Sequence, residues 1–297
     1  MREILPGLFL IDLDLPLPGF RNFVSCWLWQ KGGNTILVDP GPLSTVPHLL
    51  RELKHAQVQK IDYILLTHIH IDHAGGVGRL AEYFPQAQIC CHPKGIPHLI
   101  DPEKLWQGSL KVLGTLARTY GPIVPVPKDR LFFSPEIGLN GTHIEVLETP
   151  GHAAHHLSYR LGETLFVGEA AGVRIKWKDR LYTRPATPPK FIYEIYRHSL
   201  ERLLPYSSLD LCFAHYGCQS GEADFFRNAL NQLDLWLKIL KEALKAGISD
   251  ASILTERLLE RDDRLKSFFA MPKDIQERER YFIANSIRGM VGYLQNA

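Results

Sequence analysis

The segment at residues 61–76, IDYILLTHIHIDHAGG, places four side chains that can bind a metal ion within six positions, directly after an apolar stretch. In an extended chain, residues two apart share a face, so His68 and His70 can converge on one cation through neutral imidazole nitrogens. If the chain turns into a helix near Asp72, then Asp72 and His73 enter the same cavity from another angle and suit a second cation. This density of ligands predicts a metal site rather than a surface loop with incidental histidines.

Three further candidates each follow an apolar, strand-like stretch: His152 in ETPGH, Glu169 in LFVGEAAG and His215 in CFAHYG. Functional groups of open α/β folds collect at the ends of strands. Each residue alone could be a core or loop residue held by hydrogen bonds. Their occurrence together with four other candidates predicts that they complete the metal site.

Five separated motifs, VDPG at 38–41 followed by THIHIDH, TPGH, GEAAG and AHYG, resemble in order and spacing those of metallo-β-lactamase-fold hydrolases. The resemblance covers about residues 4–220. It implies an α/β fold, a four-layer αβ/βα sandwich in which helices flank two mixed sheets. Thioesterase-like, lactonase-like and glyoxalase II-like members are the most similar branches.

The resemblance also implies a role for each candidate. One metal ion would be bound by His68, His70 and His152, the other by Asp72, His73 and His215, with Glu169 between them and with Asp39 and His156 supporting the ligands. Members of the family most often carry Asp at the bridging position, and Glu169 is one methylene longer. The affinity of the second site and the identity of the metal therefore stay open.

Two divalent cations bring four positive charges, which Asp72, Glu169 and a bridging hydroxide reduce to about one. Such a centre lowers the pKa of bound water towards neutrality and supplies a hydroxide nucleophile without Ser or Cys. We expect Asp72 to orient this hydroxide as the catalytic residue. The sequence thus predicts a dinuclear hydrolase of a small-molecule thioester, ester or lactone, with zinc as the expected metal and iron or manganese as alternatives.

Three other functions stay open on the same ligand set. One is a sulfur dioxygenase-like oxidoreductase with a single iron. Another is a metal-dependent phosphodiesterase, although a net charge of +2 gives poor support for contacts along a nucleic-acid backbone. The third is a ligand-binding or signalling protein of low activity.

The segment VRIKWKDRLYTRPATPPKF, soon after Glu169, is locally basic. It should border the cavity if Glu169 is a ligand, so it predicts an anionic group on the substrate. Arg174, Tyr182 and Arg184 are the candidate contacts. Alternatively, basic residues at every second position form the solvated face of a strand.

The 297 residues, 45% hydrophobic and 22% charged, are typical of a folded globular protein. Short apolar runs bounded by turn residues alternate with helical patterns up to residue 220, and after that point only helical patterns are seen. We therefore predict a metallo-β-lactamase-like domain at 1–220 and a helical extension at 221–297. The predicted strands are 8–12, 24–30, 35–38, 63–66, 88–91, 143–148 and 164–167, and the predicted helices are 46–55, 77–83 and 191–204.

The extension would cover the mouth of the site or contribute to a homodimer. Its aromatic residues either line an acyl pocket or, as is more usual at helical spacing, pack in the core; they are Phe225, Phe226, Trp236, Phe268, Phe269 and Tyr281. Five cysteines without metal-ligand spacing, an N-terminus without signal-peptide character and no long uncharged apolar run predict a cytoplasmic protein with no membrane partner.

Overall fold

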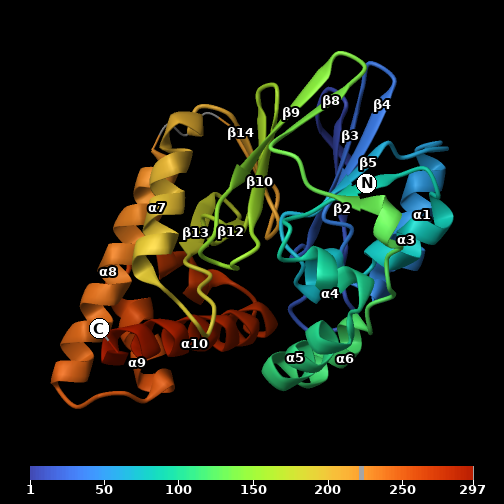
Figure 1. Cartoon of the computed structure of the whole chain (residues 1–297). Coiled ribbons are helices and arrows are strands. Elements are labelled where there is room, and N and C mark those ends of the chain that lie inside the picture. Colours follow the sequence, from blue (N-terminus) through green and yellow to red (C-terminus); the bar gives the residue numbers. More distant parts are fainter. Residues whose placement is uncertain (221–223, 297) are drawn as a thin grey trace.

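The computed structural model describes residues 1–220 and 224–296. Two β-sheets lie face to face and helices cover their outer faces (Figure 1). The first sheet runs in the order β1 (Arg2–Leu5), β2 (Leu8–Asp12), β3 (Ser25–Lys31), β4 (Asn34–Val38), β5 (Tyr63–Leu65), β6 (Gln88–Cys90) and β7 (Leu131–Phe132). It is antiparallel from β1 to β4 and parallel from β4 to β7.

The second sheet is also mixed, because β11 and β14 are parallel while the other neighbours are antiparallel. Its order is β15 (Cys218–Gln219), β14 (Asp210–Phe213), β11 (Thr164–Gly168), β10 (Leu157–Leu161), β9 (Thr142–Glu148) and β8 (Glu136–Leu139). A separate hairpin consists of β12 (Val173–Trp177) and β13 (Arg180–Arg184).

Alternating strand residues form the core between the two sheets. Trp27, Trp29 and Ile36 of the first sheet lie in one buried cluster with Tyr159 and Phe166 of the second. Residues on the opposite face of the first sheet, such as Leu28 and Leu37, instead belong to the cluster that packs against the helices. Strands buried on both faces explain why the sequence shows continuous apolar runs there.

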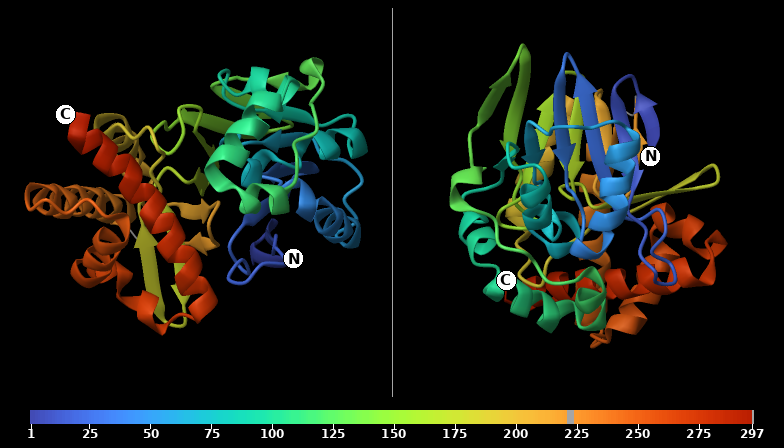
Figure 2. Two further views of the ribbon diagram at one scale, coloured as in Figure 1. Left: turned by 90° about the horizontal axis from the view of Figure 1, so that it is seen from below. Right: turned by 90° about the vertical axis from the view of Figure 1, so that its right-hand side faces the viewer.

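Helices cover the outside of each sheet (Figures 1 and 2). Those beside the first sheet are η1 (Leu43–Thr45), α1 (Val46–His55), α2 (Ile71–Ala74), α3 (Val77–Tyr83), α4 (Ile96–Ile100), α5 (Glu103–Leu113), α6 (Thr115–Tyr120) and η2 (Lys128–Arg130). Those beside the second sheet are α7 (Tyr193–Leu203), η3 (Leu204–Tyr206), α8 (Phe225–Lys245), α9 (Ala251–Arg261), η4 (Asp263–Ala270) and α10 (Lys273–Asn296).

The predicted fold class is confirmed, since two mixed sheets are flanked by helices and followed by C-terminal helices. All seven predicted strands and all three predicted helices are present, with ends that differ by at most two residues. Helices α5 and α6 and the short strands β1, β7 and β8 were not predicted. The short strands carry too few residues for a periodic pattern to show, whereas α5, with 11 residues, is as long as helices that were predicted.

The C-terminal helices begin and end where the sequence indicates. The carboxylate of Asp250 accepts hydrogen bonds from the backbone N–H groups of Ser252 and Ile253 and so caps α9. Gly247 follows α8 in the left-handed conformation, with φ of +76°. The predicted boundary at 220/221 borders residues 221–223, which lie outside the described part of the chain, so the division into two domains stays a prediction.

The hairpin β12–β13 packs on the C-terminal helices rather than standing free. The Arg184 side chain at its end donates a hydrogen bond of 2.6 Å to Glu279 on α10, and both side chains are buried. In the view from below, helix α10 crosses the hairpin β12–β13 (Figure 2). No helix among residues 1–220 and 224–296 is long and apolar enough to cross a membrane.

Candidate metal centre and substrate cavity

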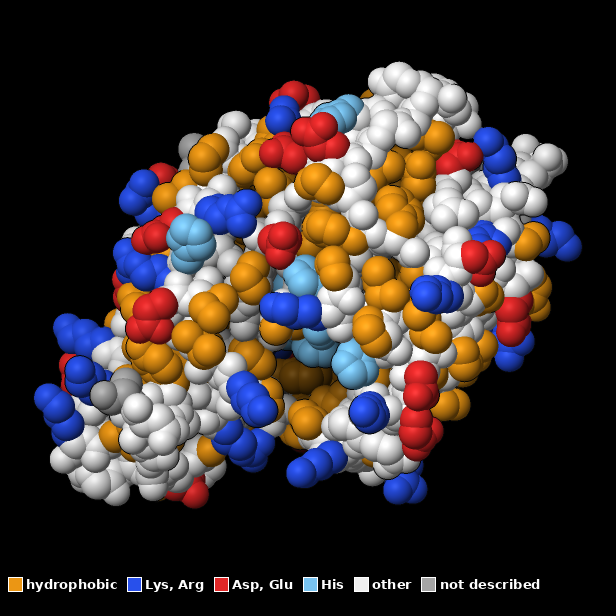
Figure 3. Space-filling model, viewed as in Figure 1, with side chains coloured by type: hydrophobic (Ala, Val, Ile, Leu, Met, Phe, Trp, Pro, Cys, Tyr) orange, Lys and Arg blue, Asp and Glu red, His pale blue; other side chains and the backbone are white. Residues whose placement is uncertain are grey.

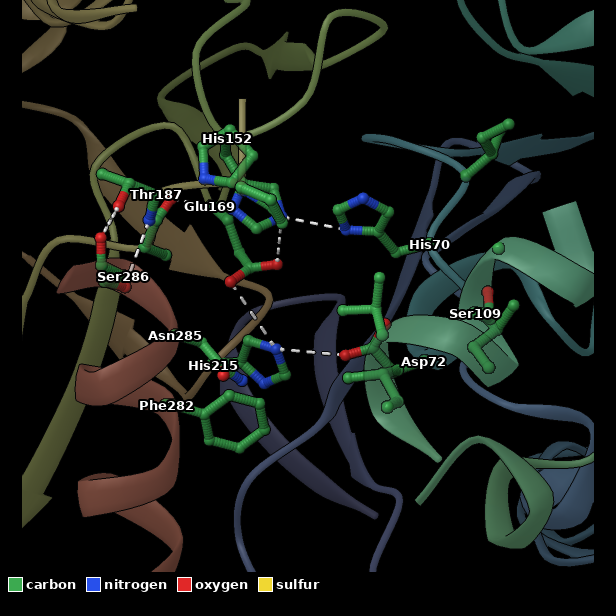
Figure 4. Close-up of a pocket in the computed structure, with 18 of the residues that line it drawn as sticks. His70, Asp72, Ser109, His152, Glu169, Thr187, His215, Phe282, Asn285 and Ser286 are labelled. Atoms are coloured by element: carbon green, nitrogen blue, oxygen red, sulfur yellow. Dashed lines mark hydrogen bonds and ion pairs between the residues drawn. The ribbon is translucent and has the colours of Figure 1, made fainter. Parts of the chain in front are cut away.

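The seven predicted ligands meet at the edge where the strands of both sheets end. Their ligand atoms form two groups, each within 4.8 Å across: His68, His70, His152 and Glu169 in one, and Asp72, His73 and His215 in the other. Figure 4 shows five of them facing one another across one cavity. The sequence prediction that these residues converge therefore agrees with the structure.

Two changes of backbone direction bring the THIHIDH segment to this point. Strand β5 ends at Leu65, and the extended residues that follow carry His68 and His70. His70 then precedes the single turn α2, which contains Asp72 and His73. The turn presents its side chains from a different angle than the extended segment, as the spacing predicts.

Glu169 reaches both groups of ligands. Its Oε2 atom lies 3.0 Å from His152 Nε2, 3.4 Å from His68 Nε2 and 3.3 Å from His73 Nε2. Its Oε1 atom lies 3.8 Å from His215 Nε2. The additional methylene of Glu, compared with the usual Asp, therefore does not carry the carboxylate away from either group.

Hydrogen bonds to Nδ1 fix the orientation of His68. The Thr67 hydroxyl donates to Asp39 Oδ2 at 2.6 Å, so it accepts at 3.0 Å from His68 Nδ1. The Thr67 backbone N–H also donates to Asp39 Oδ1 at 2.8 Å. With Nδ1 protonated, the lone pair of His68 Nε2 faces the cavity, which is how outer hydrogen bonds orient metal ligands. Asp39 thus supports a ligand, as the resemblance implies.

Backbone carbonyl groups orient two more histidines in the same way. His152 Nδ1 donates to the Ala186 carbonyl at 2.9 Å, and His215 Nδ1 donates to the Phe23 carbonyl at 2.8 Å. In both side chains Nε2 is left for the cavity. Because Nδ1 faces a carbonyl oxygen in each ring, Nε2 is the nitrogen that a cation can bind.

His156 holds the backbone of Glu169. Its Nε2 accepts a hydrogen bond of 3.0 Å from the Glu169 N–H, and its Nδ1 pairs with the Thr149 hydroxyl at 2.9 Å. Gly168 makes this contact possible, because it has φ of +61° and a Cβ there would lie 2.4 Å from His156 Nε2. His156 is therefore a supporting residue, as the resemblance implies.

The charges of the centre suit a cation. Burial, followed by the proximity of His152, lowers the pKa of His70 to about 3, and burial lowers the pKa of His68 well below its usual range. Burial would raise the pKa of Glu169, but His152 and His215 outweigh it and hold this pKa well below its usual range. Two neutral imidazoles and an ionised carboxylate therefore face the cavity at neutral pH.

His73 differs from these histidines. Burial disfavours its charged form, but Asp72 and Glu169 outweigh burial and raise the pKa of His73 to about 9. A cation binding here displaces this proton, so metal and proton compete at one ring.

Unpaired buried atoms test whether a metal fits. His68 Nε2 and both ring nitrogens of His73 are buried and have no hydrogen-bond partner among residues 1–220 and 224–296. Buried polar atoms normally have partners, because burial without one costs free energy. Imidazole and carboxylate donors are those of divalent zinc, iron and manganese sites. The donor set and its unpaired nitrogens therefore fit two divalent cations.

A cavity of about 710 Å³ opens beside the centre. Its walls come from α5, from α10 and from the chain after β13, and they include Leu105, Val112, Pro188 and Phe282. The surface view shows a hollow with a hydrophobic floor, histidines at its edge and basic side chains on both sides (Figure 3). The cavity thus combines an apolar interior with a cationic rim.

The three predicted substrate contacts are placed differently. Arg184 lines the cavity, but it is buried and paired with Glu279. The lining residues do not include Arg174, whose Nε donates to Gln219 at 2.7 Å, or Tyr182, which is buried beside Glu279. Lys176 points to solvent from β12, so the basic segment forms a hairpin with an exposed basic face.

Sequence reasoning missed the basic residues of the rim. Lys94, Lys104 and Arg288 line the cavity and are exposed, and none forms an ion pair with a carboxylate in the described part of the chain. They are far apart in sequence, so no motif connects them. The aromatic lining also differs from the candidates, because Phe23 and Phe282 line the cavity while Phe225, Phe226, Trp236 and Phe268 are core residues.

Residues 19–215 match the family model described as the metallo-beta-lactamase superfamily. The chain belongs to this superfamily. Within it, the chain is 30% identical over 193 residues to the metallo-beta-lactamase fold-containing protein ST1585 of Sulfurisphaera tokodaii, covering 63% of this chain and 70% of that protein. These matches confirm the predicted family.

Two relatives with a named activity are matched over a smaller share of their own length than ST1585. The hydroxyacylglutathione hydrolase of Aeromonas hydrophila is 30% identical over 160 residues, which is 52% of this chain and 49% of that enzyme. The chain therefore matches about half the length of that relative. The hydroxyacylglutathione hydrolase of Aeromonas salmonicida is 28% identical over 64% of this chain and 66% of that enzyme.

Solved structures of the superfamily share the fold over the whole chain. ST1585 from Sulfolobus tokodaii superposes with a TM-score of 0.70 at 23% identity, covering 96% of this chain and 98% of that one. TTHA1429 from Thermus thermophilus superposes with a TM-score of 0.69 at 22% identity, covering 99% of this chain and 95% of that one. The superpositions include the C-terminal helices, so these helices are part of the shared fold.

Proposed function

We propose that this superfamily member is a dinuclear metallohydrolase of a small-molecule thioester, with an ester or lactone as the alternative bond. The proposal of two metal ions rests on the position of Glu169. Its carboxylate lies within 3.8 Å of histidines from both ligand groups. The thioester follows from the likeness to hydroxyacylglutathione hydrolases. Zinc is the expected metal.

When bound, the two cations would supply the Lewis acidity that polarises a carbonyl group and acidifies a water molecule. The residues of the chain would hold the two cations and orient the water molecule. His68, His70 and His152 hold one position, Asp72, His73 and His215 the other, and Glu169 lies between them. The Asp72 carboxylate, half-buried beside His73 and His215, is the acceptor that would orient the attacking water.

The cavity supports a small substrate with an apolar acyl group and a distant anionic group. Its apolar interior suits the acyl chain and, at about 710 Å³, it admits a metabolite rather than a polymer. Lys94, Lys104 and Arg288 at the rim lack carboxylate partners in the described part of the chain and would attract an anion. We therefore assign the anionic group to the end of the substrate farthest from the metal ligands.

Metal analysis and a substrate panel test this proposal. Protein purified without a histidine tag should contain two zinc or manganese ions per chain by elemental mass spectrometry. It should hydrolyse at least one substrate class in a panel of acyl-CoA, acylglutathione and lactone compounds. His70→Ala should abolish turnover, whereas His198→Ala, which removes an exposed histidine on α7, should leave turnover unchanged.

Two other outcomes of these experiments would contradict the proposed function. A single iron together with oxygen uptake on a persulfide substrate would replace the hydrolase with sulfur dioxygenation. Absence of turnover on the whole panel by metal-loaded protein would overturn the substrate assignment.

Charge reversal at the rim tests whether its basic residues bind an anionic group of the substrate. Lys104→Glu should raise KM for a polyanionic thioester about fivefold and leave KM for a neutral short-carrier thioester unchanged. Lys111→Glu is the matched control, because Lys111 is exposed on the same helix and does not line the cavity. Equal effects of the two variants would contradict the anionic assignment.

A further inference from the structure

The ring of Phe23 lies between His215 and a side chain from the far end of the sequence. The Phe23 and His215 ring centroids are 4.1 Å apart, with an angle of 19° between the planes. The guanidinium carbon of Arg278, on α10, lies 3.9 Å from the centre of the Phe23 ring. Two groups this close to one ring centre must occupy its opposite faces. The three side chains therefore form a single stack.

Phe23 restrains His215 in two ways. Its carbonyl accepts the hydrogen bond from His215 Nδ1, which sets the direction of the imidazole. Its ring packs flat on the imidazole, which sets the plane. Together they direct His215 Nε2 towards Asp72 Oδ2 at 3.6 Å and Glu169 Oε1 at 3.8 Å (Figure 4).

Arg278 is itself fixed. Its Nε donates to Glu279 Oε1 at 2.9 Å, while Glu279 Oε2 accepts from Arg184 at the end of the hairpin. A further N–H of Arg278 donates to the Gly19 carbonyl. Arg278 and Glu279 are buried, and a cation over an aromatic ring is attracted more strongly when water is excluded. Helix α10, the hairpin and the segment before β3 therefore meet at the Arg278–Glu279 pair.

We propose that Arg278 is a positioning residue for His215, through which helix α10 sets the affinity of the Asp72–His73–His215 metal site. The inference rests on the proposed function in that it requires a cation at this site. It gives the C-terminal helices a role in the metal centre in addition to forming a wall of the cavity.

Titration of the metal-free full-length protein with Co²⁺ tests the proposal, with binding followed by calorimetry and by visible absorption of the bound ion. His215→Ala identifies the binding step that depends on this ligand. Arg278→Met, which keeps a long apolar side chain and removes the charge, should weaken that step about tenfold and leave the other step unchanged. Arg278→Lys should restore part of the loss, because it keeps the charge without the planar group.

Two further variants separate positioning from general destabilisation. Phe23→Leu leaves every charge in place, so it should cause the same selective loss even if Arg278→Met fails to fold. The double variant Phe23→Leu/Arg278→Met should weaken the His215-dependent binding step no more than Phe23→Leu alone. Arg280→Met is the matched control, because Arg280 lies on the same helix, 4.7 Å from the Phe268 ring, and pairs with Glu256. It should leave both steps unchanged.

The outcomes are distinct. Equal weakening of both steps, or no weakening by either Arg278→Met or Phe23→Leu, would overturn the positioning role while wild-type protein still binds two ions. Wild-type protein that binds fewer than two ions would refute the proposed dinuclear centre, and that result is read before any Arg278 variant is made.

Discussion

His68 and His215 belong to the two different ligand groups of the centre and are held in different ways. Thr67, the residue directly before His68 in the chain, and Asp39, at the end of β4, hold His68 through hydrogen bonds. His215 is held by the carbonyl and ring of Phe23, which lies 192 residues away in sequence. Behind Phe23 stands Arg278, 63 residues beyond His215 in the chain.

The difference shows that one active centre can combine a local and a distant means of orientation. A hydroxyl and a carboxylate next to a strand end orient His68 within the sandwich itself. Packing between the sandwich and the C-terminal helices orients His215. We therefore expect changes in the helices to affect one side of the centre and changes beside β5 to affect the other.

Glu169 is common to both sides, so its removal should have the largest effect. Glu169→Ala should lower hydrolysis about 1,000-fold, because Lewis-acid catalysis contributes several kcal/mol. One metal ion per chain should be lost in elemental analysis. Glu169→Asp, which restores the carboxylate usual in the family, is the control and should retain both ions. Two ions bound to Glu169→Ala would contradict a bridging carboxylate.

Breaking the buried network behind His215 should have the next largest effect. Burial would raise the pKa of Glu279, but Arg184 and Arg278 outweigh it and lower this pKa to about 2. Because the pKa is lower in the folded state, the stabilisation is present above pH 4.5 and is lost as the pH falls towards 2. Glu279→Gln should cost about 3 kcal/mol of unfolding free energy at pH 7.

Urea unfolding between pH 3 and pH 7 measures this contribution. The wild-type free energy of unfolding should fall more steeply on acidification than that of Glu279→Gln, so the two curves approach each other at low pH. Parallel curves would show that Glu279 contributes nothing through its charge.

Substitution of Gly168 should disturb the part of the centre around Thr67 and His156. Ala at this position has an unfavourable φ of +61°, and its Cβ would lie 2.8 Å from the Thr67 Cβ and closer still to His156. Gly168→Ala should cost about 2 kcal/mol of stability, measured by thermal unfolding. Gly162→Ala also has a positive φ, of +57°, but open space around it. An equal cost for both variants would mean that the crowding at Gly168 is unimportant.

The smallest predicted change is the loss of one hydroxyl. Thr67→Val keeps the shape of the side chain and removes the acceptor for His68 Nδ1. The affinity of the site containing His68 should fall about tenfold, and the step that depends on His215 should not change. Metal titration of the two variants Thr67→Val and Arg278→Met side by side would show opposite selectivity if the comparison between His68 and His215 holds.

The sequence was informative where function depends on neighbouring residues. The spacing of His68, His70, Asp72 and His73 after an apolar strand is sufficient to predict their convergence, and the structure confirms it. Thr67 was missed, although a hydroxyl directly before the first histidine was a readable signal. The alternation of basic residues after Glu169 suggested the solvated face of a strand as an alternative, and Lys176, Lys178 and Arg180 are exposed whereas Arg174 is buried.

Long-range packing could not be predicted in the same way. Lys94, Lys104 and Arg288 reach the same rim from three separate elements, and nothing in their local sequences links them. The stack of Arg278, Phe23 and His215 likewise depends on how α10 crosses the sandwich (Figure 2). Such contacts follow from the tertiary arrangement rather than from periodicity or motif.

Helix α5 forms one wall of the cavity, yet none of its residues is fully buried. Leu105 and Ser109 are half-buried and Val112 is exposed, and most substitutions at exposed positions change stability by only about 0.5 kcal/mol. A combinatorial library at these positions could alter the shape of the cavity without touching a metal ligand. In evolutionary terms, this wall can diverge between relatives and exchange one substrate for another while the chemistry is preserved.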